Sequence, residues 1–557
     1  MSARTSCLAA IIGIAAALLV ACAVSNQPPP PERSASSASV HLARFEADDN
    51  PIDDPGSPGE KRAMQYTEAY FKNLGLTTFV QSVPLVEMIP ETTSVRLRGP
   101  KGGVMEATGE GARFLLWHGQ QKERTSLESE VVFAGYGINS PEYDRDDYKG
   151  VNVKGKIVLV LEGSPHTGER DDLGVLGATH YGTRFYKYEE GARRGAAAVL
   201  IIHSLPSPPW EVIEAEDSGS VIDIDQAAVS SVIAMRPEVE GWLSGPAAML
   251  WFTAAGLSYE DLVTKSHELA FTPVTIPGIR VILELTSRIE RRQSQDVIAL
   301  LPGQTPEYLM LAGRWNRIDP DAWTHTFTPP TGVVPGTPEA IAAAIASVRA
   351  QKIADLSDDD GTGAAMIMET AQRLVSSGVR PLRGVAFMVT SALKSGTLGL
   401  EYYLDHPPAQ MPIDKLIALI FLDRADLEGK SRRVGKIGTD SDGALSQITR
   451  EAAIEQGRLV ELDQDVETRF YYTLSQNALE AEGVRVIYLT TLPAEDKSNH
   501  LRHVVDVDPQ HADLLPPAPP DPSRDAAFLA NITTRVANAT NWPPRIGPPV
   551  APVPPVQ

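Results

Sequence analysis

Cysteine is almost absent from this chain of 557 residues, which contains only Cys7 and Cys22. Both lie within the first 22 residues, so the body of the protein that follows has no thiol of its own. A disulfide framework, a cysteine-ligated metal site and a cysteine nucleophile are therefore excluded for that body. Any catalysis or metal binding there has to use oxygen and nitrogen side chains.

Basic residues are also scarce relative to acidic ones. The chain has 50 Lys and Arg against 71 Asp and Glu, which gives a formal net charge of -21. Such a balance argues against nucleic acid or an anionic membrane surface as the main partner, and a solvated acidic surface is the simplest explanation. The hydrophobic and charged fractions, 43% and 22%, are ordinary for a soluble globular protein, and the length allows two or three domains.

The N-terminus lacks an apolar run of the roughly 20 residues that a membrane-spanning helix needs. Arg4 precedes an apolar run over residues 8–21, and this order is typical of a secretory signal. "LVAC" at its end resembles a bacterial lipobox, in which the cysteine is acylated. Ordinary signal cleavage nearby is the alternative, but a lone Cys22 has no disulfide or packing role there. We therefore predict lipidation of Cys22 and attachment to a membrane of the cell envelope, with the outer membrane, facing the periplasm, favoured because Ala23 is not Asp.

Composition then divides the chain into further segments. Residues 1–22 are the predicted signal, 23–42 a Pro- and Ser-rich flexible tether, and 546–557 a Pro-rich tail. Short β runs and glycine turns over 85–289 predict an inserted β-rich domain. The flanking segments, 43–84 together with 290–545, predict one α/β domain.

Short apolar runs alternate with helical patterns from about residue 296 onward. Near-continuous apolar runs suit strands buried on both faces of a mainly parallel sheet flanked by helices. The predicted strands are 296–301, 307–313, 384–391, 415–423 and 484–489. Helices are predicted at 57–76, 184–195, 337–352, 363–378 and 441–457, and Ser57 with Pro58 suits the start of the first of them.

Polar residues follow the ends of these predicted strands. In open α/β sheets, ligands and catalytic groups gather outside the carboxyl ends of the strands. Arg314 follows one strand, Asp423 ends another, and "ALKSG" follows a third. The loops 357–363 and 498–503 add carboxylates and His500. Together these residues predict a cleft that holds carboxylates, a histidine and several cations.

At this point the chain resembles the zinc-dependent aminopeptidase and glutamate carboxypeptidase family (peptidase clan MH), in a bacterial form with a protease-associated insert. The resemblance covers roughly residues 43–545. It is carried by "VVFAGYGINSPEYDRDDYKGVNVKGKIVLVL", "YKYEEGARRGAAAVLIIH", "TLGLEYYLDHPP" and "LANITTRVANATNWP". It implies a zinc exopeptidase fold with a protease-associated domain at 85–289.

The family's two-metal site uses an H-x-D histidine, a bridging Asp, a Glu-Glu pair, a second Asp and a late His. Three of these positions match Asp359, Asp423 and His500. At the other positions the first His is replaced by Arg314, its orienting Asp by Asn316, the general base by Leu393 and the neighbouring ligand by Lys394.

These replacements imply that the site is degenerate. Arginine offers no lone pair to a metal, and leucine cannot accept a proton. Without metals, Asp359 and Asp423 would face each other unneutralised, so we expect Arg314 and Lys394 to pair with them. The leading hypothesis is a lipid-anchored, catalytically inactive protein that needs no cofactor and serves binding or scaffolding toward an unknown protein or peptide.

Two enzymatic alternatives stay open. In one, Asp359, His500 and Asp423 hold a single zinc and the protein is a divergent hydrolase or aminopeptidase acting on peptides, with His325 or a carboxylate of 494–497 as base. In the other, the full family activity is retained under a different residue matching. The "EE" at 189–190 is a poor candidate for that, because it lies on a predicted helix of the insert where a solvated face explains it better.

Overall fold

The computed structural model describes part of the chain, and it separates Met1–Ser36 from Ser37–Gln557 as two units. Every described residue belongs to the second unit, whose fold is given below. The described residues are 37–46, 55–107, 112–165, 181–203, 210, 213–214, 219–230, 235–314, 361–390, 398–422, 424–437, 443–462, 479, 483–491 and 519–544.

A mixed sheet of eleven strands is the largest element of the described part. Its main path runs β10 (Val221–Ile224), β1 (Thr77–Arg98), β13 (Arg280–Leu301), β15 (Gly384–Thr390), β14 (Tyr308–Arg314), β16 (Leu416–Leu422), β19 (Arg485–Thr491), β17 (Arg433–Ile437) and β18 (Leu459–Leu462). β2 (Val104–Glu106) and β4 (Arg124–Ser129) pair at the side with β1 and β13. The α/β prediction is confirmed, with parallel pairing among β15, β14, β16 and β19 and again between β17 and β18.

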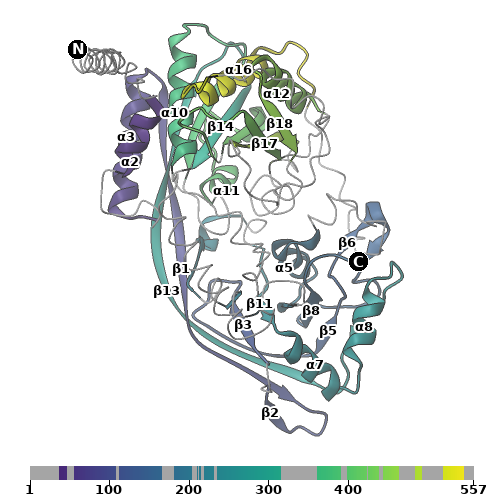
Figure 1. Cartoon of the computed structure of the whole chain (residues 1–557). Helices are drawn as coiled ribbons and strands as arrows, with labels where there is room; N and C mark the ends of the chain where they lie inside the picture. Colours follow the sequence, from purple (N-terminus) through teal and green to yellow (C-terminus); the bar gives the residue numbers. More distant parts are fainter. Residues whose placement is uncertain are drawn as a thin grey trace, which may run out of the picture. The chain divides into compact units, whose positions relative to one another are not determined.

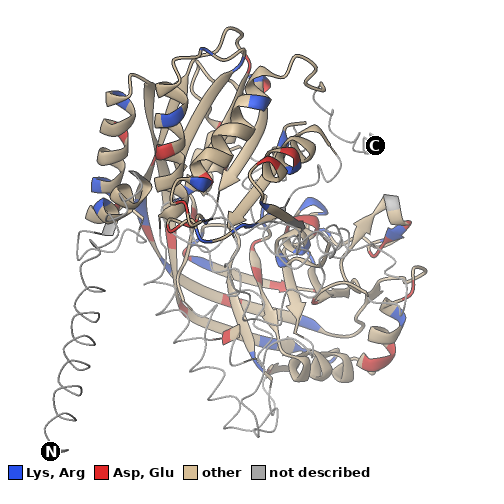
Figure 2. Ribbon diagram, turned by 45° about the horizontal axis from the view of Figure 1, so that its top comes forward, with Lys and Arg blue, Asp and Glu red and all other residues tan. Residues whose placement is uncertain are grey.

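The central strands form where the sequence predicts them because their side chains are apolar on both faces. Every residue of β14, β15 and β16 is buried, and β15 and β16 contain no charged residue. In Figure 2 charged residues mark the helices and the β1–β13 pair instead. The five predicted strands all coincide with observed strands, although β13 pairs antiparallel to β15.

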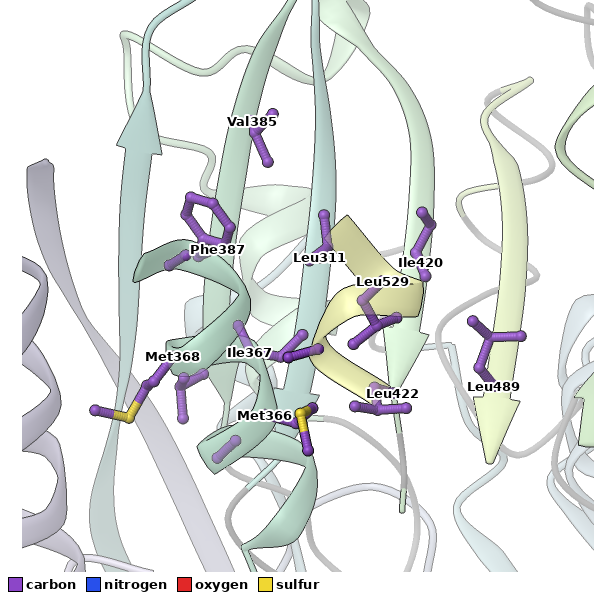
Figure 3. Close-up of a cluster of buried hydrophobic side chains, with 14 of the residues drawn as sticks. Leu311, Met366, Ile367, Met368, Val385, Phe387, Ile420, Leu422, Leu489 and Leu529 are labelled. Atoms are coloured by element: carbon purple, nitrogen blue, oxygen red, sulfur yellow. The ribbon is translucent and has the colours of Figure 1, made fainter. Parts of the chain in front are cut away.

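Helices cover both faces of the large sheet. Its main core lies under α2 (Ser37–Glu46), α3 (Pro58–Asn73), α10 (Thr362–Ser376), α12 (Ala444–Glu455) and α16 (Arg524–Asn538). Figure 3 shows Met366, Ile367 and Leu529 from α10 and α16 against Leu311 and Phe387 of the strands. On the opposite face, α11 (Leu398–Asp405) packs Leu400 and Tyr403.

Four of the five predicted helices are confirmed within one turn at each end. α3 begins where predicted, since Ser57 accepts a hydrogen bond from the Glu60 N–H at 3.0 Å and Pro58 occupies the first turn. α10, α12 and α5 (Arg184–Arg193) match the other three. The fifth, at 337–352, lies outside the described residues.

The helix α2 differs from the prediction of a flexible tether over 23–42. Residues 37–42 are helical, and Ala38 and His41 are buried together with Phe45 at the same helical spacing. The Ala38 N–H also donates to Glu369 Oε2 of α10 at 2.9 Å. The Ser- and Ala-rich composition suggested a linker, but the apolar stripe fixes this end of it on the core.

The region predicted as an insert contains a second sheet. Its order is β12 (Val274–Thr275), β5 (Val131–Phe133), β8 (Ile157–Leu161), β9 (Ala198–Ile202), β11 (Val239–Leu243) and β3 (Phe114–His118). Among the described residues, three helices accompany this sheet: α5, α7 (Gly245–Ala254) and α8 (Tyr259–Ser266). Smaller elements are β6 (Asn139–Ser140), β7 (Arg145–Asp146) and the 3-10 turns Pro141–Tyr143, Gln226–Ala228 and Ile413–Lys415.

Two long strands connect this region with the large sheet. β1 and β13 pair antiparallel from Thr77 opposite Leu300 to Arg98 opposite Arg280 (Figure 1). The predicted domain boundaries at residues 85 and 289 fall inside these strands, and the assignment of 85–289 as a protease-associated domain stays a prediction. Among the helices of the described ranges, none combines the length and apolar character that crossing a membrane requires.

Candidate functional site at the carboxyl edge of the sheet

The ends of the parallel strands bring the predicted site region to one edge of the sheet. Arg314 ends β14 and is in register with Thr390 at the end of β15, while Gly313 is in register with Leu422 of β16. Among the predicted site residues, Arg314 is the one that the structure describes. Residues outside the described part are Cys22, Asn316, Asp359, Leu393, Lys394, Asp423 and His500, as are His325 and 494–497 of the alternative.

Arg314 is a buried cation at this edge. Its side chain is 1% exposed, and its Nη2 donates a hydrogen bond to the Tyr488 hydroxyl at 3.3 Å. The Tyr488 ring stacks on Phe421 with centroids 5.2 Å apart, so the acceptor is held in place by packing. A guanidinium keeps its charge at any working pH, and burying it is costly unless it is paired. The side chain therefore sets a permanent positive charge where the family resemblance places an imidazole.

A carboxylate lies close to the same edge. Asp296 of β13 is fully buried, and its Oδ1 accepts a hydrogen bond from the Thr390 hydroxyl at 2.9 Å. A Cβ added at Gly399, in the first turn of α11, would come within 2.1 Å of the same oxygen. The backbone at the start of this helix thus approaches the carboxylate closely, where the positive end of the helix dipole stabilises a negative charge.

Glycines also let α10 approach the end of β14. A Cβ added at Gly313 would lie 2.9 Å from the carbonyl carbon of Gly363, so this contact tolerates no side chain. Thr362, the first residue of α10, accepts a hydrogen bond from the Ala425 N–H at 3.3 Å. The start of α10 is thereby tied to the segment that follows β16.

Sequence reasoning missed Asp296 as a member of this edge. The residue opens the apolar run "DVIALL", where an aspartate is usually a turn or cap residue. Its place follows from the antiparallel register of Val297 with Val389, which sets Asp296 beside Thr390. A single acidic residue within the stretch "RRQSQDVIALL" was the available signal, and it does not specify the strand partner.

The described residues of this edge do not fit the first metal position of the resembled family. Arg314 has no lone pair to donate, and its charge would repel a cation. Among the described residues, no three His, Cys, Asp or Glu side chains gather as a metal site. Of the described groups at the edge, the Asp296 carboxylate is the one able to ligate, and Thr390 already occupies one of its oxygens.

A second cluster of buried charges, inside the insert, is structural. Arg145 Nε lies 2.9 Å from Asp147 Oδ1, and that carboxylate also accepts from the N–H groups of Tyr136 and Ile138. Burial raises the pKa of Asp147 to about 6 and lowers the pKa of Lys187 to about 7. Lys187 Nζ donates to two backbone carbonyl groups, one of them at Tyr136. Within the described residues, these charged groups contact one another or the backbone of residues 136–163.

A family model matches part of the chain. Residues 342–513 match the model of Peptidase family M28. The resemblance to a zinc-dependent peptidase family is confirmed for this region, which contains α10, β15 and β16 and begins after Arg314. A search of curated proteins finds no match to the chain.

Solved structures with weak similarity to the chain include three bacterial enzymes. An aminopeptidase from Aneurinibacillus sp. strain AM-1 is 14% identical with a TM-score of 0.44, over 93% of this chain and 96% of its own. The zinc aminopeptidase BSAP from Bacillus subtilis gives 15% and 0.37, over 90% and 95%. A Peptidase M28 precursor from Shewanella amazonensis SB2B gives 14% and 0.37, over 92% and 96%.

Proposed function

We propose that this peptidase-like protein is anchored to the cell envelope through Cys22 and binds a peptide or protein partner without hydrolysing it. The observation that carries the proposal is the buried guanidinium of Arg314 at the carboxyl end of β14. Two-metal hydrolysis needs cations at that edge to polarise a carbonyl group and to lower the pKa of a bound water. A fixed positive charge in the place of a ligand opposes the binding of the first cation.

Residues outside the described part support the proposal by their chemistry. Leu393 stands where the family resemblance places the general base, and a leucine cannot take a proton from water. Lys394 stands at a ligand position and would have to lose its proton to bind a metal. Asp359 and Asp423 retain their carboxylates, and pairing with Arg314 and Lys394 balances two negative charges with two positive ones. In this account ion pairs replace the metals and no cofactor is needed.

A second candidate function is a divergent single-metal hydrolase that acts on peptides. The match to Peptidase family M28 favours it, because the matched residues include Asp359, Asp423 and His500. These three side chains have the chemistry of zinc ligands, two carboxylates and an imidazole. The base would then be His325 or a carboxylate of 494–497. This candidate predicts one bound zinc and cleavage that a chelator stops.

Metal content and activity of the purified full-length chain distinguish the two candidates. We expect substoichiometric zinc after dialysis and no EDTA-sensitive cleavage of aminoacyl p-nitroanilides. The matched positive control restores the family residues together, as Arg314→His, Asn316→Asp, Leu393→Glu and Lys394→Glu, and should bind zinc. Stoichiometric zinc with EDTA-sensitive cleavage in the unmodified chain contradicts the first proposal and supports the single-metal hydrolase.

A further inference from the structure

A cavity of about 120 Å³ lies beside β3, the edge strand of the six-stranded sheet. Its opposite wall comes from the large sheet, with Met88 and Pro90 of β1 and Val221 of β10. Reciprocal hydrogen bonds between Gln121 and Gln226 tie the loop after β3 to the turn after β10, at 2.9 and 3.3 Å. The two walls are therefore fixed relative to each other without any occupant.

The cavity runs along the backbone edge of β3. All five residues from Phe114 to His118 line it. Successive side chains of a strand point to opposite faces, so a cavity over one face would meet only alternate residues. Because the cavity contacts five consecutive residues, it follows the edge of the strand. The N–H and C=O groups of the backbone point outward at this edge.

Half of the backbone groups of β3 face away from β11. β3 pairs with β11 on the side away from the cavity. The Ser244 N–H donates to the Arg113 carbonyl at one end of β3, and the Gly119 N–H donates to the Glu238 carbonyl at the other. In an antiparallel pair every second residue makes such bonds, so these two bonds identify the residues that face β11. Leu115 and Trp117 then bond to β11, while Phe114, Leu116 and His118 direct their N–H and C=O groups toward the cavity. For Leu116, which is 5% exposed, no partner is found among the described residues. Buried backbone groups seldom lack a partner in the native state.

A side chain adds a second vacant group. His118 is 1% exposed and lines the cavity, and its Nδ1 lies 3.1 Å from the Thr125 hydroxyl. Its Nε2 is buried and has no hydrogen-bond partner among the described residues. Burial lowers the pKa of His118, assisted by the nearby charge of Lys122, so the ring is neutral at pH 7. A neutral imidazole can donate to or accept from a peptide group.

The chemistry of the lining selects the occupant. Among the described residues, no charged side chain lines the cavity. Its walls are mainly apolar, with Met88, Pro90, Leu116 and Val221 among them, and Thr93 and Ser287 add two hydroxyl groups. The volume is somewhat below that of an apolar cavity of about 150 Å³ that holds a benzene ring. We propose that the cavity binds an extended peptide segment, which adds a strand to the edge of β3 and buries one neutral apolar side chain. This mode of recognition takes its affinity from main-chain hydrogen bonds and its specificity from alternate side chains.

An adjoining pocket extends the proposed site. It shares Trp117 and Val221 with the cavity and is lined by charges of both signs, among them Arg236 and Glu240. Arg236 is held by Glu240 through two contacts of 2.5 Å, and Trp117 Nε1 donates to the same carboxylate at 3.1 Å. In an extended peptide the residue next to the buried one points to the opposite face. That neighbour would therefore meet polar groups, so the bound segment alternates apolar and polar residues.

The test uses calorimetric titrations of the full-length chain with the blocked pentapeptides acetyl-Val-Thr-Xaa-Thr-Val-amide, in which the central residue Xaa is Val, Leu, Met or Phe. Edge pairing engages only alternate peptide amides. N-methylation of the central residue and N-methylation of the residue before it should therefore differ, with one weakening binding by roughly tenfold or more and the other leaving it nearly unchanged. Peptide binding should also slow amide exchange at Phe114, Leu116 and His118, and not at Leu115 or Trp117.

A pair of glycine substitutions supplies the matched control. Gly219 lines the cavity and Gly103 does not. At both positions an added Cβ would meet no atom within 4 Å, and neither residue has a positive φ. Gly219→Leu should fill the cavity and weaken binding by roughly tenfold, while Gly103→Leu should not, with unchanged melting temperatures for both. The proposal is overturned if no peptide of the series binds, or if both N-methylated forms or both glycine variants bind alike. It does not depend on whether the chain hydrolyses peptides.

Discussion

At the scale of single residues, Arg314 provides a buried positive charge at the candidate site. Its guanidinium is buried at the end of β14, and the Tyr488 hydroxyl satisfies one of its donors. Removing a buried ion leaves its partners without compensation, which usually destabilises more than the ion pair itself stabilises. The same residue is therefore expected to matter for stability and to oppose metal binding, two effects that mutation can separate.

Arg314→Ala should lower the free energy of unfolding by on the order of 3 kcal/mol, since it leaves a cavity and uncompensated partners in a buried site. The matched control is Arg291→Ala, because the Arg291 side chain is 77% exposed and its loss should shift the melting temperature little. Thermal unfolding followed by circular dichroism measures both variants. Equal shifts would show that the buried charge is not a stabilising part of the edge.

The sequence predicted which residues follow the strands but not all of their neighbours. Arg314 could be placed, because an apolar run ends directly before it. Asp296 could not, since its position beside Thr390 depends on an antiparallel register that no local pattern specifies. The prediction that the "EE" at 189–190 lies on a solvated helix face is correct for only one of the two residues. Glu189 is exposed, but Glu190 is buried and pairs with Arg194 at 2.6 Å and with Arg193.

At the scale of elements, α2 shows how a linker-like sequence becomes part of the core. His41 lies on its buried stripe, 3% exposed, with Nδ1 2.7 Å from the Tyr66 hydroxyl and its ring edge-on to Tyr70. Burial lowers the pKa of His41 from 6.5 to about 4, and the negative charge of Glu369 opposes this only in part. The folded protein thus holds this imidazole neutral in mildly acidic solution.

This lowered pKa predicts an acid-sensitive stability. Between pH 6.5 and 4 the unfolded chain binds a proton at His41 and the folded chain does not, so the free energy of unfolding falls as the pH falls. The effect reaches up to about 3 kcal/mol near the lower limit. His41→Phe should flatten the melting temperature across this range, whereas His406→Phe, at a side chain 42% exposed, should not. Parallel pH profiles of the wild type and the His41 variant would contradict the assignment.

Elements were predicted better than their pairing. Apolar runs predicted β14, β15 and β16, because a strand buried on both faces has a nearly continuous apolar sequence. Helical spacing predicted α3 and α10, because a helix that packs on one side has apolar residues every three or four positions. Strand direction leaves no such record, and β13 pairs antiparallel although its sequence resembles that of the parallel strands. The predicted tether failed at residues 37–42 because composition alone does not register an apolar stripe of three residues.

At the scale of the whole molecule, the proposed membrane attachment depends on the first 22 residues. The chain offers a matched pair for its test, since Cys7 and Cys22 are its only cysteines. Cys22→Ser should move the protein from the membrane to the soluble fraction and abolish labelling by an alkyne fatty acid. Cys7→Ser should change neither. A Cys22 variant that stays membrane-bound and labelled would remove lipidation at this residue from the proposal.

The β1–β13 pair also decides how the molecule can be divided. Its ladder runs unbroken from Thr77 to Pro90 and, after a shift of register, from Thr92 to Arg98. A cut at residues 85 and 289 would sever both strands in mid-ladder and leave open edges on each fragment, which favour aggregation. The β1–β13 pair belongs to the large sheet and also connects it with the region that holds the second sheet. Neither region can therefore be excised or exchanged as a cassette at those points.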